Sequence, residues 1–261
     1  MAAPDGTVGK AMDVLERVAS YGGPVRFADL LSEGGYPKAT LYRLLQVLVN
    51  QRLLTIDRAT GKYELGVRLV RLAHQAWSQA SLAPLARPHL EHLAQVTGQA
   101  VHLAQLDGGQ VLYLDKLNPA QPVEMFSAIG RVGPAYCTGV GKAMLAFLPG
   151  EALESALSQQ SFHRFTPATL DRAGLLAEHE AIRREGVAWD RQEHEPGITC
   201  LAAPVLSDAG RVLGAVSITS AGGGEALLAA HTGIVKDTAG AIARDAAAWR
   251  FPEQSKLNVA E

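Results

Sequence analysis

The residues best suited to contact a polyanion lie between Gly34 and Ile56, a stretch that contains no acidic residue. Basic and aromatic side chains gather there near the start of a predicted helix that follows Pro37. Arginine suits guanine edges in the major groove of DNA, and lysine, threonine and tyrosine suit phosphates or bases. The candidate DNA contacts of this helix are Tyr36, Lys38, Thr40, Tyr42 and Arg43. The alternative is the solvated polar face of an ordinary helix.

A predicted hairpin follows this helix and adds two basic residues, Arg58 in its turn and Lys62 at the start of its second strand. The apolar run Leu53–Ile56 predicts the first strand, and Lys62–Leu65 predicts the second. Apolar residues at helical spacing predict two earlier helices, at Val8–Tyr21 and Phe27–Ser32. Three helices followed by a small hairpin are typical of a winged helix-turn-helix domain.

A second group of candidate binding residues surrounds the stretch Gly139-Val140-Gly141-Lys142. It is not a phosphate-binding loop, because Tyr136 stands where that loop needs glycine and Ala143 stands where it needs serine or threonine. Thr138 is suited to cap a helix that begins here. The backbone N–H groups of Gly139 and Val140 would then be free to bind a carboxylate. The alternative is a tightly packed glycine turn.

The second part of the chain combines helices with hairpins. Asp107-Gly108-Gly109 and Ser207–Gly210 are turn sequences, and each separates two strand-like runs. The predicted strands are Ala100–Leu106, Gln110–Leu117, Pro122–Ile129, Thr199–Leu206 and Arg211–Ser220. The predicted helices are Gly66–Ser81, Leu90–Val96, Val140–Phe147, Leu175–Glu185 and Glu225–Trp249.

The composition fits a globular protein with one large or two modest domains. The 261 residues are 48% hydrophobic and 19% charged, which is enough apolar side chain for a buried core. The net charge is −2, but residues 1–71 carry ten Lys and Arg against seven Asp and Glu, so the basic part contains the candidate DNA contacts. No apolar run is long enough to span a membrane and the start shows no signal-peptide pattern, so we expect a cytoplasmic protein without a membrane partner.

The sequence contains little that indicates a catalytic site or a metal site. Two cysteines, Cys137 and Cys200, are too few for a disulfide framework or a four-cysteine zinc site. A thiol nucleophile at Cys200, with His102 or His194 as its base, lacks a supporting motif. Only His89 and His92, of eight histidines, have the spacing of metal ligands on one helix. We therefore expect no catalytic residues, no bound metal and no cofactor.

With these features taken together, the chain resembles the IclR family of bacterial transcriptional regulators. The stretch Tyr36–Leu45, followed by Tyr63–Gly66, is similar to the family's DNA-binding head. The stretches Gly139–Ala143, Arg184–Ala188 and Gly197–Pro204 are similar to its effector-domain signatures. The resemblance covers essentially the whole chain in the family's order. It implies an α+β protein with an N-terminal winged helix-turn-helix domain and a C-terminal GAF-like α/β effector-binding domain, joined by a linker helix.

The resemblance also implies which residues contact the effector. They are the backbone of Gly139 and Val140, the side chains of Asp190, Cys200, Ser217 and Thr219, and the apolar walls Met125 and Ile198. Ser217 and Thr219 are two residues apart on a predicted strand, so they face the same side. Thr219 stands where the family usually has serine and keeps the hydroxyl. Gly133 stands where a larger apolar residue can wall the pocket, which predicts a roomier pocket here, and Cys137 is a further candidate contact.

Together these features predict an effector-responsive regulator that binds double-stranded operator DNA and represses a catabolic operon. The expected boundaries are 1–70 for the DNA-binding domain, 71–82 for the linker helix, 83–250 for the effector domain and 251–261 for a tail. One recognition helix contacts few base pairs, so we expect a homodimer, and the resemblance implies a dimer of dimers. The expected effector is a small carboxylate such as a sugar acid or keto acid. The alternative is a stand-alone GAF-like metabolite-binding or enzymatic protein whose N-terminal helices mediate protein contacts.

Overall fold

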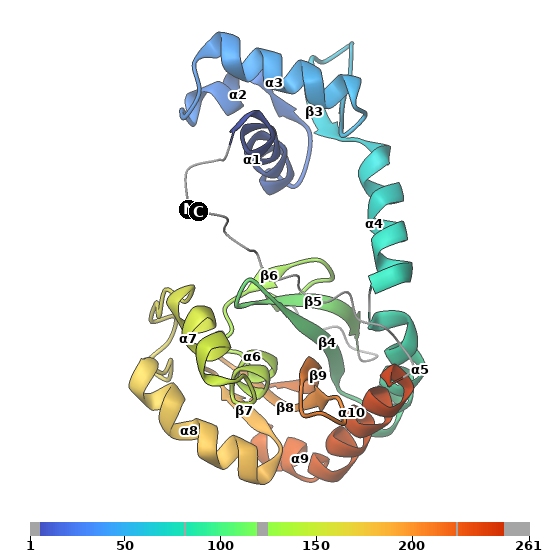
Figure 1. Cartoon of the computed structure of the whole chain (residues 1–261), viewed down its shortest axis with the longest axis vertical. Helices are drawn as coiled ribbons and strands as arrows, with labels where there is room; N and C mark the ends of the chain where they lie inside the picture. Colours follow the sequence, from blue (N-terminus) through green and yellow to red (C-terminus); the bar gives the residue numbers. More distant parts are fainter. Residues whose placement is uncertain (1–5, 81, 119–124, 223, 248–261) are drawn as a thin grey trace. The chain divides into compact units, whose positions relative to one another are not determined.

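Two hydrophobic cores organise the chain. The computed structural model describes residues 6–80, 82–118, 125–222 and 224–247. The chain divides into two units between Gln79 and Ala80. Figure 1 shows the elements of each unit, which are described separately below.

Apolar stripes on three helices make the core of the first unit. Its elements are α1 Gly6–Ser20, β1 Val25–Arg26, α2 Phe27–Ser32, α3 Lys38–Asn50, β2 Leu54–Ile56 and β3 Lys62–Leu65. Leu41, Leu44, Leu45 and Leu48 of α3 are buried, and they share a core with Val14 of α1. The strands form an antiparallel sheet in the order β1-β3-β2. The first unit is therefore the predicted helix-turn-helix domain with its hairpin.

The predicted helices and hairpin of the first unit agree closely with the structure, but the sequence does not predict β1. This strand has two residues, and it is identified by the pairing of Val25 with Tyr63 of β3. Two residues are too few to show an alternation of apolar and polar side chains. After β3 the chain forms α4, Val67–Ala80, and the division between the two units falls in its last turn. The linker helix predicted at 71–82 overlaps α4, and the exact domain boundaries stay a prediction.

Two hairpins supply most of the sheet in the second unit. Its strands are β4 Ala100–Asp107, β5 Gln110–Leu117, β6 Val132–Gly133, β7 Ala188–Arg191, β8 Ile198–Leu206 and β9 Val212–Ala221. They form one antiparallel sheet in the order β6-β5-β4-β9-β8-β7. The two predicted hairpins, β4–β5 and β8–β9, lie on either side of the central β4–β9 pairing. Residues that are far apart in the sequence therefore become neighbours on one face of the sheet.

Helices cover both faces of this sheet. They are α5 Ala83–Thr97, α6 Gly139–Leu145, α7 Gly150–Ser158, α8 Arg172–Glu185, α9 Glu225–Ala229 and α10 Thr232–Ala246. Figure 1 shows α6, α7 and α8 on one face and α5 and α10 on the other. The small residues Ala104, Ala202 and Ala215 lie beneath α6 and pack with its Val140 and Met144. The fold is the predicted two-domain arrangement, with a helix-turn-helix unit followed by an α/β unit.

Several predictions for the second unit are wrong in detail. The helix predicted over Glu225–Trp249 is two helices that meet at Ala230 and His231, a break that the alanine-rich sequence does not reveal, and residues 248–261 lie outside the described residues. The strand predicted over Pro122–Ile129 lies partly outside them as well. Its described part, from Met125, forms no strand, because the chain turns at Gly130 and pairs only from Val132. The sequence analysis also misses α7 and the short edge strand β7.

Candidate DNA-binding surface and effector pocket

Three of the residues predicted to contact DNA lie on the exposed side of α3. Lys38, Tyr42 and Arg43 are all exposed, while the opposite side of the helix is buried in the core of the first unit. Lys38 and Tyr42 are four residues apart and therefore neighbours on the helix surface. The described surface of α3 carries no carboxylate, since the helix contains no acidic residue. It is suited to approach phosphates without electrostatic repulsion.

The other two predicted residues of this segment are only partly accessible. Tyr36 and Thr40 are half-buried. The guanidinium of Arg17 lies over the Tyr36 ring, 5.1 Å from its centroid, so Tyr36 contributes to packing between α1 and the start of α3. Two further residues of this exposed side were not among the predicted DNA contacts. They are Val47, which is 47% exposed, and Asn50, which is exposed. Both share the face of Arg43, and their spacing of four and seven residues from it is the signal that identifies them.

The hairpin presents one of its two predicted basic residues fully. Arg58 is exposed, whereas Lys62 is half-buried. Asp57 holds the turn by accepting hydrogen bonds from the Ala59 N–H at 2.9 Å and the Thr60 hydroxyl at 2.7 Å. The bond from Thr60 is the largest cause that lowers the pKa of the Asp57 carboxyl. The one acidic residue of the turn is therefore engaged in its geometry.

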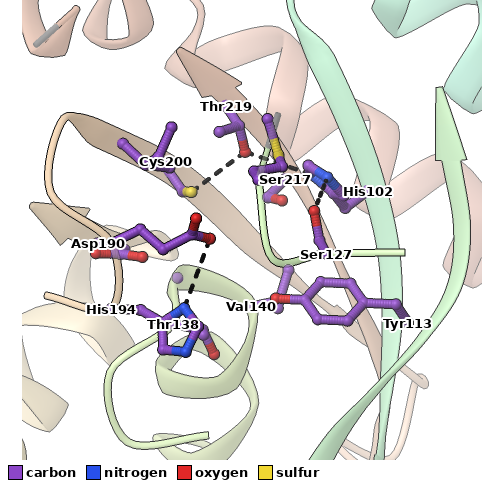
Figure 2. A pocket seen from close by; sticks show the side chains of 14 residues that line it. His102, Tyr113, Ser127, Thr138, Val140, Asp190, His194, Cys200, Ser217 and Thr219 are labelled. Carbon is purple, nitrogen blue, oxygen red and sulfur yellow. Dashed lines mark hydrogen bonds and ion pairs between the residues drawn. The ribbon is translucent and has the colours of Figure 1, made fainter. Parts of the chain in front are cut away.

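A cavity in the second unit brings together all eight residues predicted to bind an effector (Figure 2). With its opening to solvent included, the empty space bounded by these residues is about 390 Å³. The predicted residues that line it are Met125, Gly139, Val140, Asp190, Ile198, Cys200, Ser217 and Thr219. The structure adds His102, Tyr113, Ser127, Thr138, His194 and Glu195. The cavity lies between the start of α6 and one face of the sheet.

Strand register explains why distant residues meet in this cavity. Asp190 of β7 lies opposite Cys200 of β8, and Cys200 lies opposite Thr219 of β9, so the three form a row across the sheet. His102 of β4 lies opposite Ser217 of β9. Because side chains on a strand alternate between faces, Ser217 and Thr219 face the same side. The sequence shows the spacing within each strand but not the pairing between strands.

The start of α6 forms the other wall, and Thr138 is its N-cap residue as predicted, but the Thr138 side chain makes no capping hydrogen bond. Thr138 precedes the helix with an extended backbone, and its hydroxyl donates to the carbonyl oxygen of Pro134 at 2.8 Å instead of accepting from the helix. A Cβ at Gly139 would lie 3.3 Å from the Cβ of Cys200, and one at Gly141 would lie 2.2 Å from the carbonyl oxygen of Ala135. Gly141 therefore serves close packing, while Gly139 lines the cavity.

A chain of hydrogen bonds runs along the sheet side of the cavity. The Ser127 hydroxyl lies 2.8 Å from Nε2 of His102, and the Thr219 hydroxyl lies 3.3 Å from Nδ1. Thr219 also donates to Sγ of Cys200 at 3.2 Å. Burial, followed by the nearby charge of Lys116, lowers the pKa of His102 to about 3, so its ring is neutral at physiological pH. Burial likewise raises the pKa of the Cys200 thiol, which argues against a reactive thiolate.

Acidic residues give the cavity an unusual charge balance. Asp190 is 3% exposed, and burial raises the pKa of its carboxyl to about 7. One of its oxygens accepts the Glu193 N–H at 2.8 Å. Behind this pair, the fully buried Lys142 donates to Glu178 at 2.7 Å and to Glu193 at 2.5 Å. Lys142 therefore neutralises carboxylates beneath the cavity and binds no phosphate there.

Two further predictions about the cavity are wrong. Cys137 is completely buried in the core below α6 and does not line the cavity. The ring of Phe126 fills the space beside Gly133, because a Cβ added to Gly133 would lie 3.0 Å from it. The glycine therefore does not enlarge the cavity. Among the residues missed, His102 and Tyr113 stand on predicted strands. Because side chains alternate between the two faces of a strand, both residues can lie on the face that borders the cavity, but no sequence motif identifies them.

The described residues show neither a metal site nor a membrane span. Across the described ranges, no group of three or more His, Cys, Asp or Glu residues is placed to hold a metal ion. His89 of the candidate histidine pair instead contacts Asp245 of α10 at 2.7 Å. In the same part of the chain, no helix is long and apolar enough to cross a membrane.

Two family models match the chain, one for each unit. Residues 7–58 match the IclR helix-turn-helix domain, and residues 74–244 match the bacterial transcriptional regulator IclR C-terminal domain. The HTH-type transcriptional regulator XynR of Escherichia coli K12 is 31% identical over 82% of this chain and 85% of its own length. The DNA-binding transcriptional repressor YiaJ of the same strain is 30% identical over 80% of this chain and 76% of its own length. These relatives are regulators and not enzymes.

Solved structures show the same architecture. The IclR structure from Thermotoga maritima superposes with a TM-score of 0.73 at 27% identity, covering 92% of this chain and 98% of that one. An IclR homologue from Microbacterium hydrocarbonoxydans, solved with 4-hydroxybenzoate, gives a TM-score of 0.81 at 24% identity over 92% and 98% of the two chains. Both family models, the relatives and the folds agree. The chain belongs to the IclR family of bacterial transcriptional regulators.

Proposed function

We propose that this regulator binds double-stranded operator DNA through α3 and its hairpin, represses a catabolic operon, and responds to a small carboxylate such as a sugar acid or keto acid. The observation that carries the effector part is the cavity, because all eight residues expected to contact an effector line it. Relatives named as transcriptional regulators and repressors support the DNA part. The alternative of an N-terminal unit that binds only proteins leaves the carboxylate-free basic face of α3 without a role.

A carboxylate effector fits the donors around the start of α6. Burying a carboxylate costs several kcal/mol unless hydrogen-bond donors replace water. The N–H groups of Gly139 and Val140 belong to the first turn of α6, where no intrahelical acceptor is available to them. Asp190 opposes a second anion only while it is ionised, and burial raises its pKa to about 7. A protonated Asp190, or one that accepts from a ligand hydroxyl, is compatible with such an effector.

Pairing of two chains through α4 is part of the same proposal. Val67 is 75% exposed, Val70 is 68% exposed and Leu72 is 43% exposed on this helix. Apolar residues in such numbers on one helix favour a protein partner. Two recognition helices also read a palindrome that one helix cannot. We expect light scattering to give a dimer or tetramer at micromolar concentration without DNA, and a monomer mass would contradict this.

The experiment that tests the function starts from selection of duplexes from a random pool by the full-length chain. Binding of the selected duplex is then followed by fluorescence anisotropy while a panel of small acids is added. We expect submicromolar binding of the selected duplex and a change in affinity with at least one acid. Failure to enrich any sequence would favour the protein-contact alternative, and enrichment without a response to any acid would leave only the DNA part.

A further inference from the structure

Two hydroxyl groups of the cavity have no partner among the described residues. They are the hydroxyls of Tyr113, a residue that is 7% exposed, and of Ser217, which is 3% exposed. Neither makes a hydrogen bond within the described part of the chain. Figure 2 shows the Tyr113 hydroxyl directed into the cavity beside Val140. An unpartnered hydroxyl that faces a cavity is available to a ligand atom or to water. Tyr113 is a donor here, because burial raises the pKa of its phenol and keeps it protonated.

The opposite wall offers acceptors, because its hydrogens are already committed. Thr219 has one hydroxyl hydrogen and donates it to Cys200 Sγ at 3.2 Å. We assign Thr219 as the acceptor in its 3.3 Å contact with His102, with the ring proton on Nδ1. The neutral ring then accepts at Nε2 from the Ser127 hydroxyl, 2.8 Å away. Ser127 and Thr219 are left with lone pairs for a ligand and no free hydrogen.

We propose that Tyr113 and the chain Ser127–His102–Thr219 make this cavity selective for hydroxy acids over keto acids of the same length. The inference rests on the proposed carboxylate effector and specifies its class. Tyr113 donates to the carboxylate at the α6 end. Ser127 and Thr219 accept hydrogen bonds from the ligand's hydroxyl groups at the other end. His102 touches no ligand in this arrangement and acts as a positioning residue that fixes the direction of the two hydroxyls.

The selectivity follows from the hydrogen-bond inventory. A hydroxyl group can donate to the lone pairs of Ser127 and Thr219, whereas a keto oxygen can only accept. A keto oxygen held against this wall could accept from the Ser217 hydroxyl but would leave the lone pairs of Ser127 and Thr219 unpaired, and sites built to bind a substrate hydroxyl strongly reject analogues that lack it. Asp190, also on this side, adds a further acceptor when ionised. The expected preference is at least about tenfold.

Calorimetry on the full-length chain tests this preference with matched acids. The pairs are lactate and pyruvate, malate and oxaloacetate, mandelate and phenylglyoxylate, and gluconate and 2-oxogluconate. We expect the hydroxy member to bind at least tenfold more tightly in every pair that binds. A keto member that binds equally or better overturns the inference and leaves the proposed function standing. No binding by any of the eight acids overturns the inference and the effector part of the proposed function, and leaves the DNA part standing.

Two variants separate the roles of the two walls. His102→Leu frees the Ser127 hydrogen to donate, so the preference should fall below about threefold, and His92→Leu on the exposed part of α5 is the matched control. Tyr113→Phe removes a donor to the carboxylate that both acids share. It should weaken both members about fivefold and leave their ratio unchanged, with exposed Tyr21→Phe as its control. An unchanged ratio in a folded His102→Leu protein contradicts the positioning role.

A spectroscopic measurement tests the His102 assignment without any ligand. In protein labelled with 15N-histidine, the His102 signals are identified by their loss in His102→Leu. We expect the neutral tautomer with its proton on Nδ1, unchanged down to about pH 5, in line with its lowered pKa. A ring that carries its proton on Nε2, or one that is doubly protonated, overturns the inference even if the variant does not fold.

Discussion

The DNA-binding surface and the effector cavity draw on the sequence in opposite ways. The surface comes from residues 36–62, within a single helix and the hairpin that follows it. The cavity draws on residues from His102 to Thr219, which lie on β4, β5, β7, β8, β9, α6 and the loops between them. A surface of the first kind depends on local helical periodicity. A site of the second kind depends on strand register and close packing, so the two should differ in how mutations affect them.

The largest difference should come from Gly141, where close packing holds α6 against the loop before it. A Cβ at this position would lie 2.2 Å from the backbone oxygen of Ala135, which cannot move aside as a flexible side chain can. We expect Gly141→Ala to destabilise the second unit by about 3 kcal/mol. Hydrogen exchange followed by mass spectrometry should show lost protection in residues 100–220 and unchanged protection in α1 and α3.

Gly150→Ala is the matched control for this prediction. Gly150 begins α7, has an ordinary backbone conformation and has no atom within 4 Å of an added Cβ. Its substitution should leave protection unchanged in both units. Equal loss of protection in α1 and α3 of the Gly141 variant would show that the two units unfold together, which would contradict the expected difference between them.

The next effect is a pH dependence that the cavity has and the DNA-binding surface lacks. Burial raises the pKa of Asp190 from 3.8 to about 7, so between these values the folded state binds a proton that the unfolded state does not. The Asp190 contribution to stability should therefore fall as the pH rises from about 4 to about 7, by up to about 4 kcal/mol, whereas the lowered pKa of buried His102 contributes in the opposite direction over the same range. Glu193 contributes in the same direction as Asp190, because burial raises its pKa as well.

Urea unfolding at several pH values measures this slope. Asp190→Asn keeps an oxygen that can accept the Glu193 N–H but does not titrate, so between about pH 4 and pH 7 its stability should fall less, or rise more, than that of the unchanged protein. Asp208→Asn, in the exposed turn of the β8–β9 hairpin, should keep the slope of the unchanged protein. Identical slopes in all three proteins would mean that Asp190 is solvated in solution and ionises normally.

Substitutions on the DNA-binding surface should change affinity without changing stability. Arg43→Ala should weaken binding of the selected duplex by about 1–3 kcal/mol and relax the sequence preference at one position. Lys38→Ala should weaken binding to all sequences and reduce the salt dependence by about one unit of slope. Anisotropy titrations at two salt concentrations measure both effects. Arg184→Ala, exposed on α8, is the control, and equal losses in it would indicate only a general charge effect.

The contrast also explains which features were predictable. Periodicity identifies α3 with its buried leucines, and the hairpin turns identify β4–β5 and β8–β9, because these signals lie within a few residues of each other. The family resemblance supplies the eight cavity residues, whose positions the spacing alone does not connect. Tyr113 and His102 are missed, since their roles arise from the β4–β9 and β4–β5 pairings and from the burial that follows. The break between α9 and α10 is missed because Ala230 and His231 are compatible with a continuous helix and the nearest glycine, Gly233, lies inside α10.

The smallest effect should come from single substitutions of polar residues in the cavity, which should change acid binding without changing DNA binding. Ser217 can donate or accept, so Ser217→Ala should weaken hydroxylated and plain acids alike, by about 1 kcal/mol, or about fivefold. Asp190→Ala should instead reduce the discrimination between them, because Asp190 accepts only from a hydroxyl. Calorimetry with the acid panel measures both, and exposed Ser155→Ala on α7 is the control. Neither cavity variant should change the affinity for DNA in the absence of an acid, since the residues predicted to contact DNA all precede residue 63. A Ser217→Ala protein that binds its effector normally but loses DNA affinity would mean that the two regions are not independently built.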